Sequence, residues 1–299
     1  MPQAQVGELE LCYRSEGHGR PLLLVMGLGA QLVFWPDALC RSMVERGYQV
    51  VRFDNRDAGE SSRLDHLPVP DVRRQILRWT LGRSVRAPYG LDAMADDAVG
   101  LLDALALPAA HVVGVSMGGM IAQLMALRHP SRVLSLTSVM SHPGDRLSMV
   151  PRPRALRALF RPVARTRVAA QDAWVQFFRT VGSTGFPFDE AELRHRAGLH
   201  FDRGTSPRGF VRHMVAVLAA RDRRPQLRAL DIPALVVHGD ADPLVPPRGG
   251  VQTARALPHA ELIRIAGMGH DLPRGAWTQI LDALDRVTEA GEARRDGAS

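Results

Sequence analysis

Short runs of apolar residues alternate along the chain with longer amphipathic stretches. The runs are almost continuously apolar, which is typical of strands that are covered on both faces, as in a parallel sheet. Strands are predicted at 21–27, 48–54, 110–116, 132–140, 232–240 and 260–267, and helices between them at 36–47, 91–107 and 118–130. This alternation of strand and helix predicts an α/β fold with a doubly wound, mostly parallel sheet. Residues 7–19 alternate polar and apolar, and predict an antiparallel hairpin at the sheet edge.

Two segments interrupt this alternation of strands and helices. Residues 62–90 are too long for a simple turn and contain a short amphipathic pattern at 71–83. Residues 145–230 contain helical patterns at 153–180 and 207–224 and no strong strand pattern. The predicted organisation is an α/β core, a helical cap or lid inserted into it, and a polar disordered tail. The predicted boundaries are 1–144 and 231–288 for the core, 145–230 for the cap and 289–299 for the tail.

The 299 residues are 45% hydrophobic, but no apolar run approaches the roughly 20 residues of a membrane helix. The first residues do not show the basic-then-apolar pattern of a secretory signal. We therefore expect a cytoplasmic protein without a membrane partner. Cys12 and Cys40 lie among apolar neighbours, which favours buried free thiols over a disulfide.

The net charge of +7 comes entirely from arginine, because the chain contains no lysine. The excess is concentrated in residues 145–230, which contain 17 arginines and 7 acidic residues. We interpret this as a solvated helical face, and attraction of an anionic substrate or surface is the alternative. Nucleic acid is not an expected partner, because no recognition motif or aromatic platform accompanies the charge.

The stretch Gly114-Val115-Ser116-Met117-Gly118 follows a predicted strand and precedes a predicted helix. A nucleophile elbow has this pattern, because the two glycines leave room for a sharp turn that exposes the serine. The alternative is a junction in which Ser116 is merely small. The nucleophile hypothesis requires an acid after a later strand and a histidine after the next one.

Later loops contain residues of both kinds. Asp240 and Asp242 follow the strand at 232–240, and His270 follows the last strand. We predict the triad Ser116, Asp242 and His270, with Asp240 bracing the turn. Asp145 is a weaker alternative acid. The remaining histidines considered are interpreted as structural: His111, His129, His142 and His238.

The oxyanion of an acyl-transfer reaction needs two hydrogen-bond donors. We expect them to be the backbone N–H groups of Met117 and Leu28, with Gly27 allowing the loop to approach closely. Aromatic and apolar side chains of the two long segments are candidates for the substrate pocket, although each also suits the packing core of a lid. They are Trp79, Trp174, Phe177, Phe178 and Phe186, together with Leu81 and Phe188.

Four motifs together resemble the α/β-hydrolase family over about residues 5–288. They are GVSMGG, FDNRDAGESS, GDADPLVP and GMGH. The resemblance implies an α/β-hydrolase fold and Ser-His-Asp chemistry. The sequence also looks like the branch that includes aclacinomycin methylesterase, which implies hydrolysis of a carboxylic ester, such as a methyl ester of a polycyclic polyketide. Two departures from the family pattern are Met26-Gly27 in place of His-Gly and Arg56-Asp57 in place of Arg-Gly; we expect Arg56 and Asp57 to pair locally.

The sequence therefore predicts a serine hydrolase that cleaves a small-molecule ester through an acyl-enzyme. The same triad could instead serve another reaction, and the alternatives are lactone opening, C–C bond hydrolysis, perhydrolysis and acyl transfer. A further alternative is a non-catalytic ligand receptor on the same fold. No metal or organic cofactor is implied. The expected assembly is a monomer or a homodimer.

Overall fold

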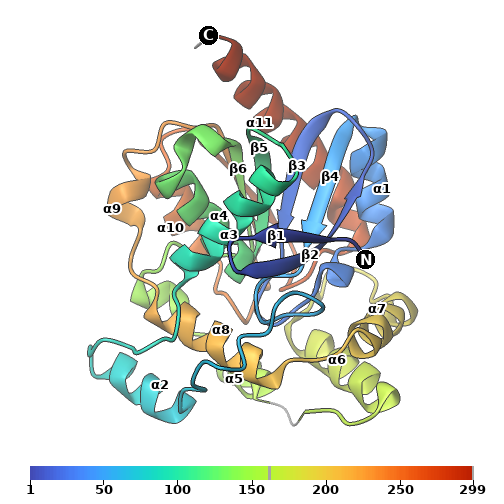
Figure 1. Cartoon of the computed structure of the whole chain (residues 1–299), viewed down its shortest axis with the longest axis vertical. Coiled ribbons are helices and arrows are strands. Elements are labelled where there is room, and N and C mark those ends of the chain that lie inside the picture. The colour runs from blue at the N-terminus through green and yellow to red at the C-terminus, as the bar shows by residue number, and fades with distance from the viewer. Residues whose placement is uncertain (161–162, 298–299) are drawn as a thin grey trace.

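The computed structural model describes residues 1–160 and 163–297, and a single eight-stranded sheet forms the centre of the protein (Figure 1). The strand order is β1-β2-β4-β3-β5-β6-β7-β8, in which β1, β2 and β4 pair antiparallel and the remaining pairs are parallel. The strands are β1 Gln3–Val6, β2 Leu9–Glu16, β3 Arg20–Val25, β4 Tyr48–Phe53, β5 Ala110–Val115, β6 Val133–Val139, β7 Ala234–Gly239 and β8 Ala260–Ile265. The predicted mostly parallel sheet and its antiparallel edge are thereby confirmed.

Helices cover both faces of the sheet (Figure 1). One face packs against α3, α4 and α10, and the other against α1 and α11. The helices outside the insertion are η1 Leu32–Phe34, α1 Asp37–Glu45, α2 Val72–Thr80, α3 Leu91–Ala104, α4 Met117–Arg128, η2 Pro130–Arg132, α10 Arg248–Ala256, η4 Arg274–Ala276 and α11 Trp277–Gly297. The helices predicted at 36–47, 71–83, 91–107 and 118–130 are all present.

Strand β3 shows why the apolar runs are continuous. Leu23 and Val25 point into the core beneath α3 and α4, whereas Leu22 and Leu24 point into the core beneath α1 and α11. Each of these four side chains is fully buried. Because successive residues of a strand face opposite sides, two covered faces require two sets of apolar residues.

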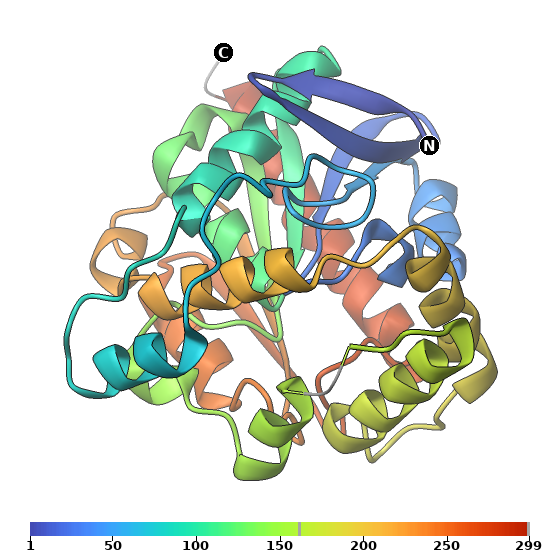
Figure 2. The same cartoon turned by 60° about the horizontal axis from the view of Figure 1, so that its bottom comes forward.

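The segment between β6 and β7 is an insertion of helices that lies over one end of the sheet (Figure 2). The predicted helical stretch 153–180 is divided in two, and a helix that the pattern did not predict begins after Asp189, whose carboxylate caps it. The helices are η3 Arg146–Met149, α5 Pro153–Leu159, α6 Arg167–Val181, α7 Glu190–Asp202, α8 Pro207–Ala219 and α9 Arg224–Leu227. The division of the chain into core and cap domains stays a prediction.

The predicted disordered tail is wrong for residues 289–297, which continue helix α11. Thr288 and Gly291 are buried, and Gly291 leaves room for the carbonyl of Leu134. Glu292 Oε1 lies within hydrogen-bond distance of His111 Nε2, at 3.0 Å. Packing against the sheet therefore orders a segment whose polar composition suggested a tail. The last predicted tail residues, 298 and 299, lie outside the described part.

The two cysteines are buried and free, as predicted. Among residues 1–160 and 163–297, no helix has both the length and the apolar character needed to cross a bilayer.

Candidate active site

Ser116 occupies a strained turn between β5 and α4. Its φ of 55° and ψ of −121° lie in a region that residues with a side chain rarely adopt. A Cβ atom on Gly114 would lie 2.1 Å from the carbonyl oxygen of Gly118, and a Cβ on Gly118 would lie 2.1 Å from that of Val25. The two glycines of the motif are therefore required for the turn, as the nucleophile-elbow hypothesis predicts.

The three residues of the predicted triad form one hydrogen-bonded chain. Ser116 Oγ lies 3.0 Å from His270 Nε2, and His270 Nδ1 lies 2.7 Å from Asp242 Oδ2. The carboxylate of Asp242 can only accept, so Nδ1 carries the proton of a neutral imidazole and Nε2 is free to accept from the serine hydroxyl. The remaining oxygen of Asp242 accepts the backbone N–H groups of Leu244 and Val245 at 2.8 and 2.9 Å.

The other acids considered have different partners. Asp240 accepts the backbone N–H of Gly267 at 2.7 Å and so braces the loop that carries His270. Asp145 caps the short helix η3 through the N–H of Ser148 and makes no contact with His270. The choice of Asp242 over both acids therefore agrees with the geometry.

The glycine loop after β3 lies directly against the serine. A Cβ on Gly27 would come within 3.2 Å of Ser116 Cβ and 3.7 Å of its Oγ. Met117 is the first residue of α4, where a backbone N–H has no acceptor inside the helix. In the described part of the chain, the N–H of Leu28 also makes no hydrogen bond. Both predicted oxyanion donors are therefore uncommitted and border the cavity that holds Ser116.

That cavity has a volume of about 940 Å³ and opens between the core and the insertion. Its polar end contains Ser116 and His270, and much of its wall is aromatic. Trp174, Phe177, Phe178 and Phe188, four of the candidate pocket residues, line this cavity. Trp174 stacks on Phe178 with ring centroids 5.9 Å apart.

Three candidate pocket residues lie elsewhere. Trp79 borders a separate cavity, where the guanidinium of Arg146 lies over its ring at 4.6 Å. Phe186 packs beneath Gly275 at the edge of the core. Leu81 is exposed to solvent. None of the three lines the cavity of Ser116, because an apolar residue in a long connecting segment carries no sign of the direction in which that segment folds.

Other segments also contribute residues to the wall of the cavity, and the sequence did not indicate them. Phe34 lies 4.3 Å from Trp174 between ring centroids, and His200 meets both rings edge-on. Burial lowers the pKa of His200 to about 4, so its imidazole is neutral at pH 7. His200 Nδ1 has no hydrogen-bond partner among the described residues. Phe34 follows the glycine loop by a few residues, and only its proximity to that loop could have suggested it.

Arg56 and Asp57 do not pair with each other, so the predicted local pair is wrong. Arg56 forms two hydrogen bonds with Asp97 of α3, at 2.5 and 2.6 Å. Asp57 accepts two hydrogen bonds from Arg212 of α8, at 2.8 and 2.6 Å, and one from Tyr89. Burial alone would raise the pKa of Asp57, but the hydrogen bonds from Arg212 and Tyr89 lower it.

The backbone of Asp57 explains why the family pattern has glycine at this position. Its φ is 66°, in the left-handed region that favours glycine, although aspartate tolerates it better than most residues. Here the side chain that replaces glycine holds a helix of the insertion.

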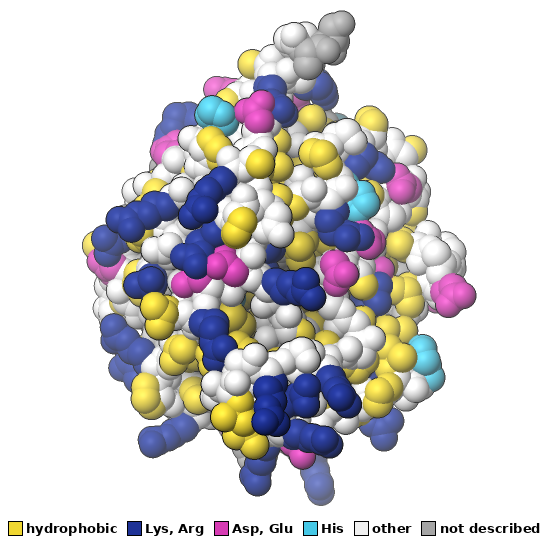
Figure 3. Space-filling model, turned by 90° about the vertical axis from the view of Figure 1, so that its left-hand side faces the viewer, with side chains coloured by type: hydrophobic (Ala, Val, Ile, Leu, Met, Phe, Trp, Pro, Cys, Tyr) yellow, Lys and Arg dark blue, Asp and Glu magenta, His cyan; other side chains and the backbone are white. Residues whose placement is uncertain are grey.

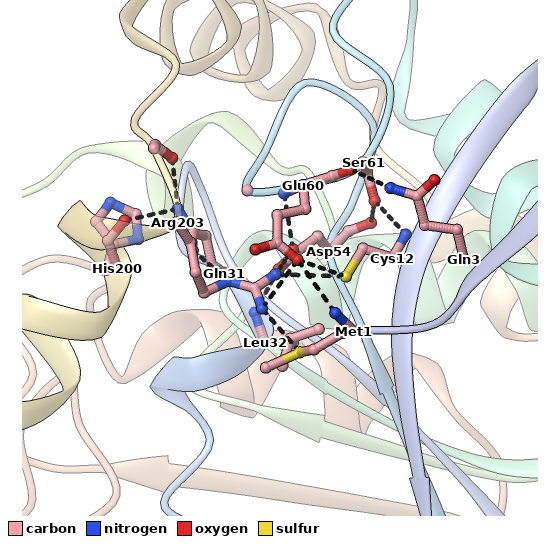
Figure 4. A network of polar contacts seen from close by, with 12 residues as sticks. Met1, Gln3, Cys12, Gln31, Leu32, Asp54, Glu60, Ser61, His200 and Arg203 are labelled. Atoms are coloured by element: carbon pink, nitrogen blue, oxygen red, sulfur yellow. Dashed lines mark hydrogen bonds and ion pairs between the residues drawn. The ribbon is translucent and has the colours of Figure 1, made fainter.

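A second polar network holds the far end of the glycine loop (Figure 4). Asp54 Oδ1 accepts the N–H of Leu32 at 2.7 Å, and its other oxygen pairs with Arg203 at the end of α7. Arg203 Nε also donates to Gln31 Oε1 at 3.0 Å, and Gln31 Nε2 donates to the carbonyls of His200 and Gly204. Burial raises the pKa of Asp54, and the charge of Arg203 opposes this. The loop is thus fixed to the insertion as well as to the core.

Together these groups provide a nucleophile, a base with an orienting acid, and two free N–H donors beside one cavity, which suits acyl transfer. A model of the alpha/beta hydrolase fold family matches residues 20–273. The chain is 31% identical to rhodomycin D methylesterase DnrP of Streptomyces peucetius over 314 residues, which is 97% of this chain and 99% of that one. It is 28% identical to 3-oxoadipate enol-lactonase 2 of Acinetobacter baylyi, over 85% and 84% of the two chains.

Solved structures share the fold. An esterase of Thermogutta terrifontis superposes with a TM-score of 0.71 at 21% identity, over 96% of this chain and 98% of that one. An enol-lactonase of Burkholderia xenovorans gives a TM-score of 0.66 at 22% identity, over 98% and 100%.

Proposed function

We propose, on the premise that this chain belongs to the α/β-hydrolase family and is an ester-cleaving hydrolase, that Ser116 attacks the ester carbonyl and forms an acyl-enzyme. The observation that carries this proposal is the continuous hydrogen-bonded chain Ser116–His270–Asp242, with distances of 3.0 and 2.7 Å, at one end of the cavity. A serine hydroxyl is a poor nucleophile at neutral pH, and a base within hydrogen-bond reach corrects this.

Each group then has one role in the reaction. His270 Nε2 takes the proton of Ser116 as its Oγ bonds to the carbonyl carbon, and it returns that proton to the departing alcohol. The negative charge on the carbonyl oxygen is held by the N–H groups of Leu28 and Met117. Asp242 keeps the imidazole in the required tautomer and stabilises its charged form. A water molecule, deprotonated by His270, then releases the carboxylic acid and regenerates Ser116.

For the substrate we propose a methyl ester carried on a bulky, largely apolar ring system. A cavity of about 940 Å³ with walls of Trp174, Phe177 and Phe178 suits such a molecule. The similarity to rhodomycin D methylesterase over nearly the full length of both chains supports the same choice. Lactone opening uses the same acyl-enzyme chemistry and is the second candidate, supported by the similarity to an enol-lactonase. The proposed partner is therefore a small molecule.

We also propose a cytoplasmic location, because Cys12 and Cys40 are free thiols and reducing compartments preserve them.

The test compares the wild type with Ser116→Ala on p-nitrophenyl butyrate and on the methyl ester of anthraquinone-2-carboxylic acid. We expect Ser116→Ala to lower kcat by about 10⁴-fold or more. Ser42→Ala is the matched control, because the Ser42 hydroxyl only bonds to a carbonyl within helix α1. A fluorophosphonate should label the wild type and not Ser116→Ala. Unlabelled wild-type protein, or turnover that survives in Ser116→Ala, would contradict the proposal.

A further inference from the structure

Helix α8 of the insertion lies directly on the oxyanion loop (Figure 2). Gly29 has a φ of 64°, and a Cβ atom there would lie 2.5 Å from the ring of Phe210 on α8. Two residues further along the helix, Arg212 forms an ion pair with Asp57 in which both side chains are fully buried. The wall of the oxyanion loop that faces away from Ser116 is therefore built by the insertion.

His213, the residue after Arg212, forms a bridge between this loop and the core. Its Nε2 lies 2.7 Å from the carbonyl oxygen of Arg56, which can only accept, so Nε2 carries a proton. Its Nδ1 lies 3.3 Å from the backbone nitrogen of Gly29 and accepts that N–H. The two neighbours thus select one neutral tautomer, which donates on one side and accepts on the other.

The surroundings of His213 keep its imidazole from taking up a second proton. The side chain of His213 is fully buried, and burial lowers its pKa to about 4. Asp57 would favour the charged form, whereas Arg212 and Arg56 oppose it. At neutral pH the acceptor for Gly29 is therefore always available.

We propose that His213 is a positioning residue of the oxyanion hole, because its Nδ1 fixes the Gly29 N–H and thereby the direction of the neighbouring Leu28 N–H. This inference rests on the proposed function, in which Leu28 donates to the oxyanion. The peptide between Leu28 and Gly29 has few other constraints: Gly29 adopts a left-handed conformation freely, and the next hydrogen bond along the loop is the weak turn from Ala30 to Gly27 at 3.3 Å.

The energetic reason is that, among the described residues, the partly buried Gly29 N–H makes one hydrogen bond, the one to His213 Nδ1. Loss of that acceptor leaves the donor unsatisfied, which favours a rotation of the Leu28–Gly29 peptide toward another partner. The Leu28 N–H belongs to the preceding peptide, which meets this one at the Leu28 Cα atom, so a loop that shifts to satisfy Gly29 also displaces the Leu28 N–H from the serine. Oxyanion stabilisation depends on donors that are already aimed before the reaction, so kcat would fall.

Two substitutions separate the two hydrogen bonds of His213. In His213→Asn the side-chain oxygen can occupy the place of Nδ1 and accept from Gly29, but it does not reach Arg56. In His213→Gln the side-chain nitrogen can occupy the place of Nε2 and donate to Arg56, but Gly29 loses its acceptor. Each variant removes one hydrogen bond made by the same helix, so we expect the two to lower the stability of the fold by similar amounts.

We expect His213→Gln to lower kcat about 10- to 100-fold with little change in KM, because ground-state binding does not use the oxyanion donors. We expect His213→Asn to keep kcat within about 3-fold of the wild type, because the loop keeps its anchor. The measurement is steady-state hydrolysis of p-nitrophenyl butyrate at pH 7.5, with thermal unfolding of both variants. Equal loss of kcat in the two variants, or no loss in His213→Gln, would overturn the proposal.

The wild-type protein provides a test that does not depend on the folding of a variant. In ¹⁵N-labelled protein the Nδ1 of His213 should resonate as an unprotonated nitrogen and show a scalar coupling to the amide nitrogen of Gly29 across the hydrogen bond. A protonated Nδ1 at pH 7 would overturn the proposal. Failure of the proposed function is a separate result, because it would appear as Ser116→Ala turnover equal to that of the wild type.

Discussion

The two halves of the helical insertion differ in whether any of their arginines reaches the core. We call α7 and α8 (Glu190–Ala219) the anchored half, and η3, α5 and α6 (Arg146–Val181) the entrance half. The anchored half inserts Arg203 and Arg212 into the core, where each meets a fully buried carboxylate. The described arginines of the entrance half lie on the surface, and where one of them pairs with a carboxylate, as Arg167 does with Asp202, both side chains are partly exposed.

The exposed apolar side chains follow the same division. Within the described residues, none of the large apolar residues of the anchored half is strongly exposed, whereas several in or beside the entrance half are. Figure 3 shows arginine side chains beside hydrophobic ones over the lower part of one face, at the level of α2 and α5 in Figure 1. The exposed residues are Leu147, Val150, Leu156, Phe160, Val163 and Val168. The count of arginines in a segment therefore says little about their role, and burial decides it.

The largest expected difference between the halves is in the free energy of unfolding. Arg212→Ala leaves Asp57 buried without its partner and should destabilise the protein by about 3–5 kcal/mol. Arg167→Ala removes an exposed pair and should cost about 0–1 kcal/mol. Urea unfolding of the two variants measures both values. Equal destabilisation would mean that the anchored half is not held as described.

The next effect concerns the substrate. Trp174 of the entrance half packs on Phe34 of the core and lines the cavity. Because Trp174→Ala removes apolar contact with the substrate, it should raise KM for a polycyclic methyl ester about 10-fold. Trp79→Ala is the matched control and should leave KM unchanged, because Trp79 borders a different cavity. Steady-state kinetics with bulky and small esters test this. A shift in KM with Trp79→Ala would show that the second cavity takes part in binding.

The smallest effect is on local opening in mild acid. The pKa values of His200 and His213 in the anchored half are lowered by burial to about 4, below the usual value of about 6.5. Between these values the unfolded chain binds more protons than the folded one, so stability falls as the pH falls from about 6.5 to about 4. The entrance half contains no histidine. Hydrogen exchange at pH 5, corrected for intrinsic rates, should show lost protection in α8 and little change in α6; equal loss in both would contradict this assignment.

The sequence allowed the sheet, its helices and the proximity of Ser116, Asp242 and His270 to be predicted, because each depends on local rules. Continuous apolar runs such as β3 indicate covered strands, and the Ser116 turn requires glycines at fixed spacing. The acid and the histidine follow because strands of a parallel sheet end at a common edge, where their loops meet.

The pocket and the anchoring contacts could not be predicted in the same way. Trp79 and Trp174 have similar local surroundings in the sequence, yet only Trp174 reaches the cavity. The pairs of Asp57 with Arg212 and of Gly29 with His213 join positions more than 150 residues apart, and no periodicity links them. The predicted tail failed for a related reason, since Gly291 packs against a strand far away in sequence.

The replacement of glycine by Asp57 restricts how this protein can recombine with its relatives. A relative with glycine at that position offers no carboxylate to Arg212, and an insertion without that arginine leaves the buried Asp57 without its ion-pair partner. Exchange of insertions, by evolution or in a chimera designed to alter specificity, therefore works only when both residues are transferred together. Asp57 and Arg212 thus make the insertion and the loop after β4 a single heritable unit, although more than a hundred residues separate them in the chain.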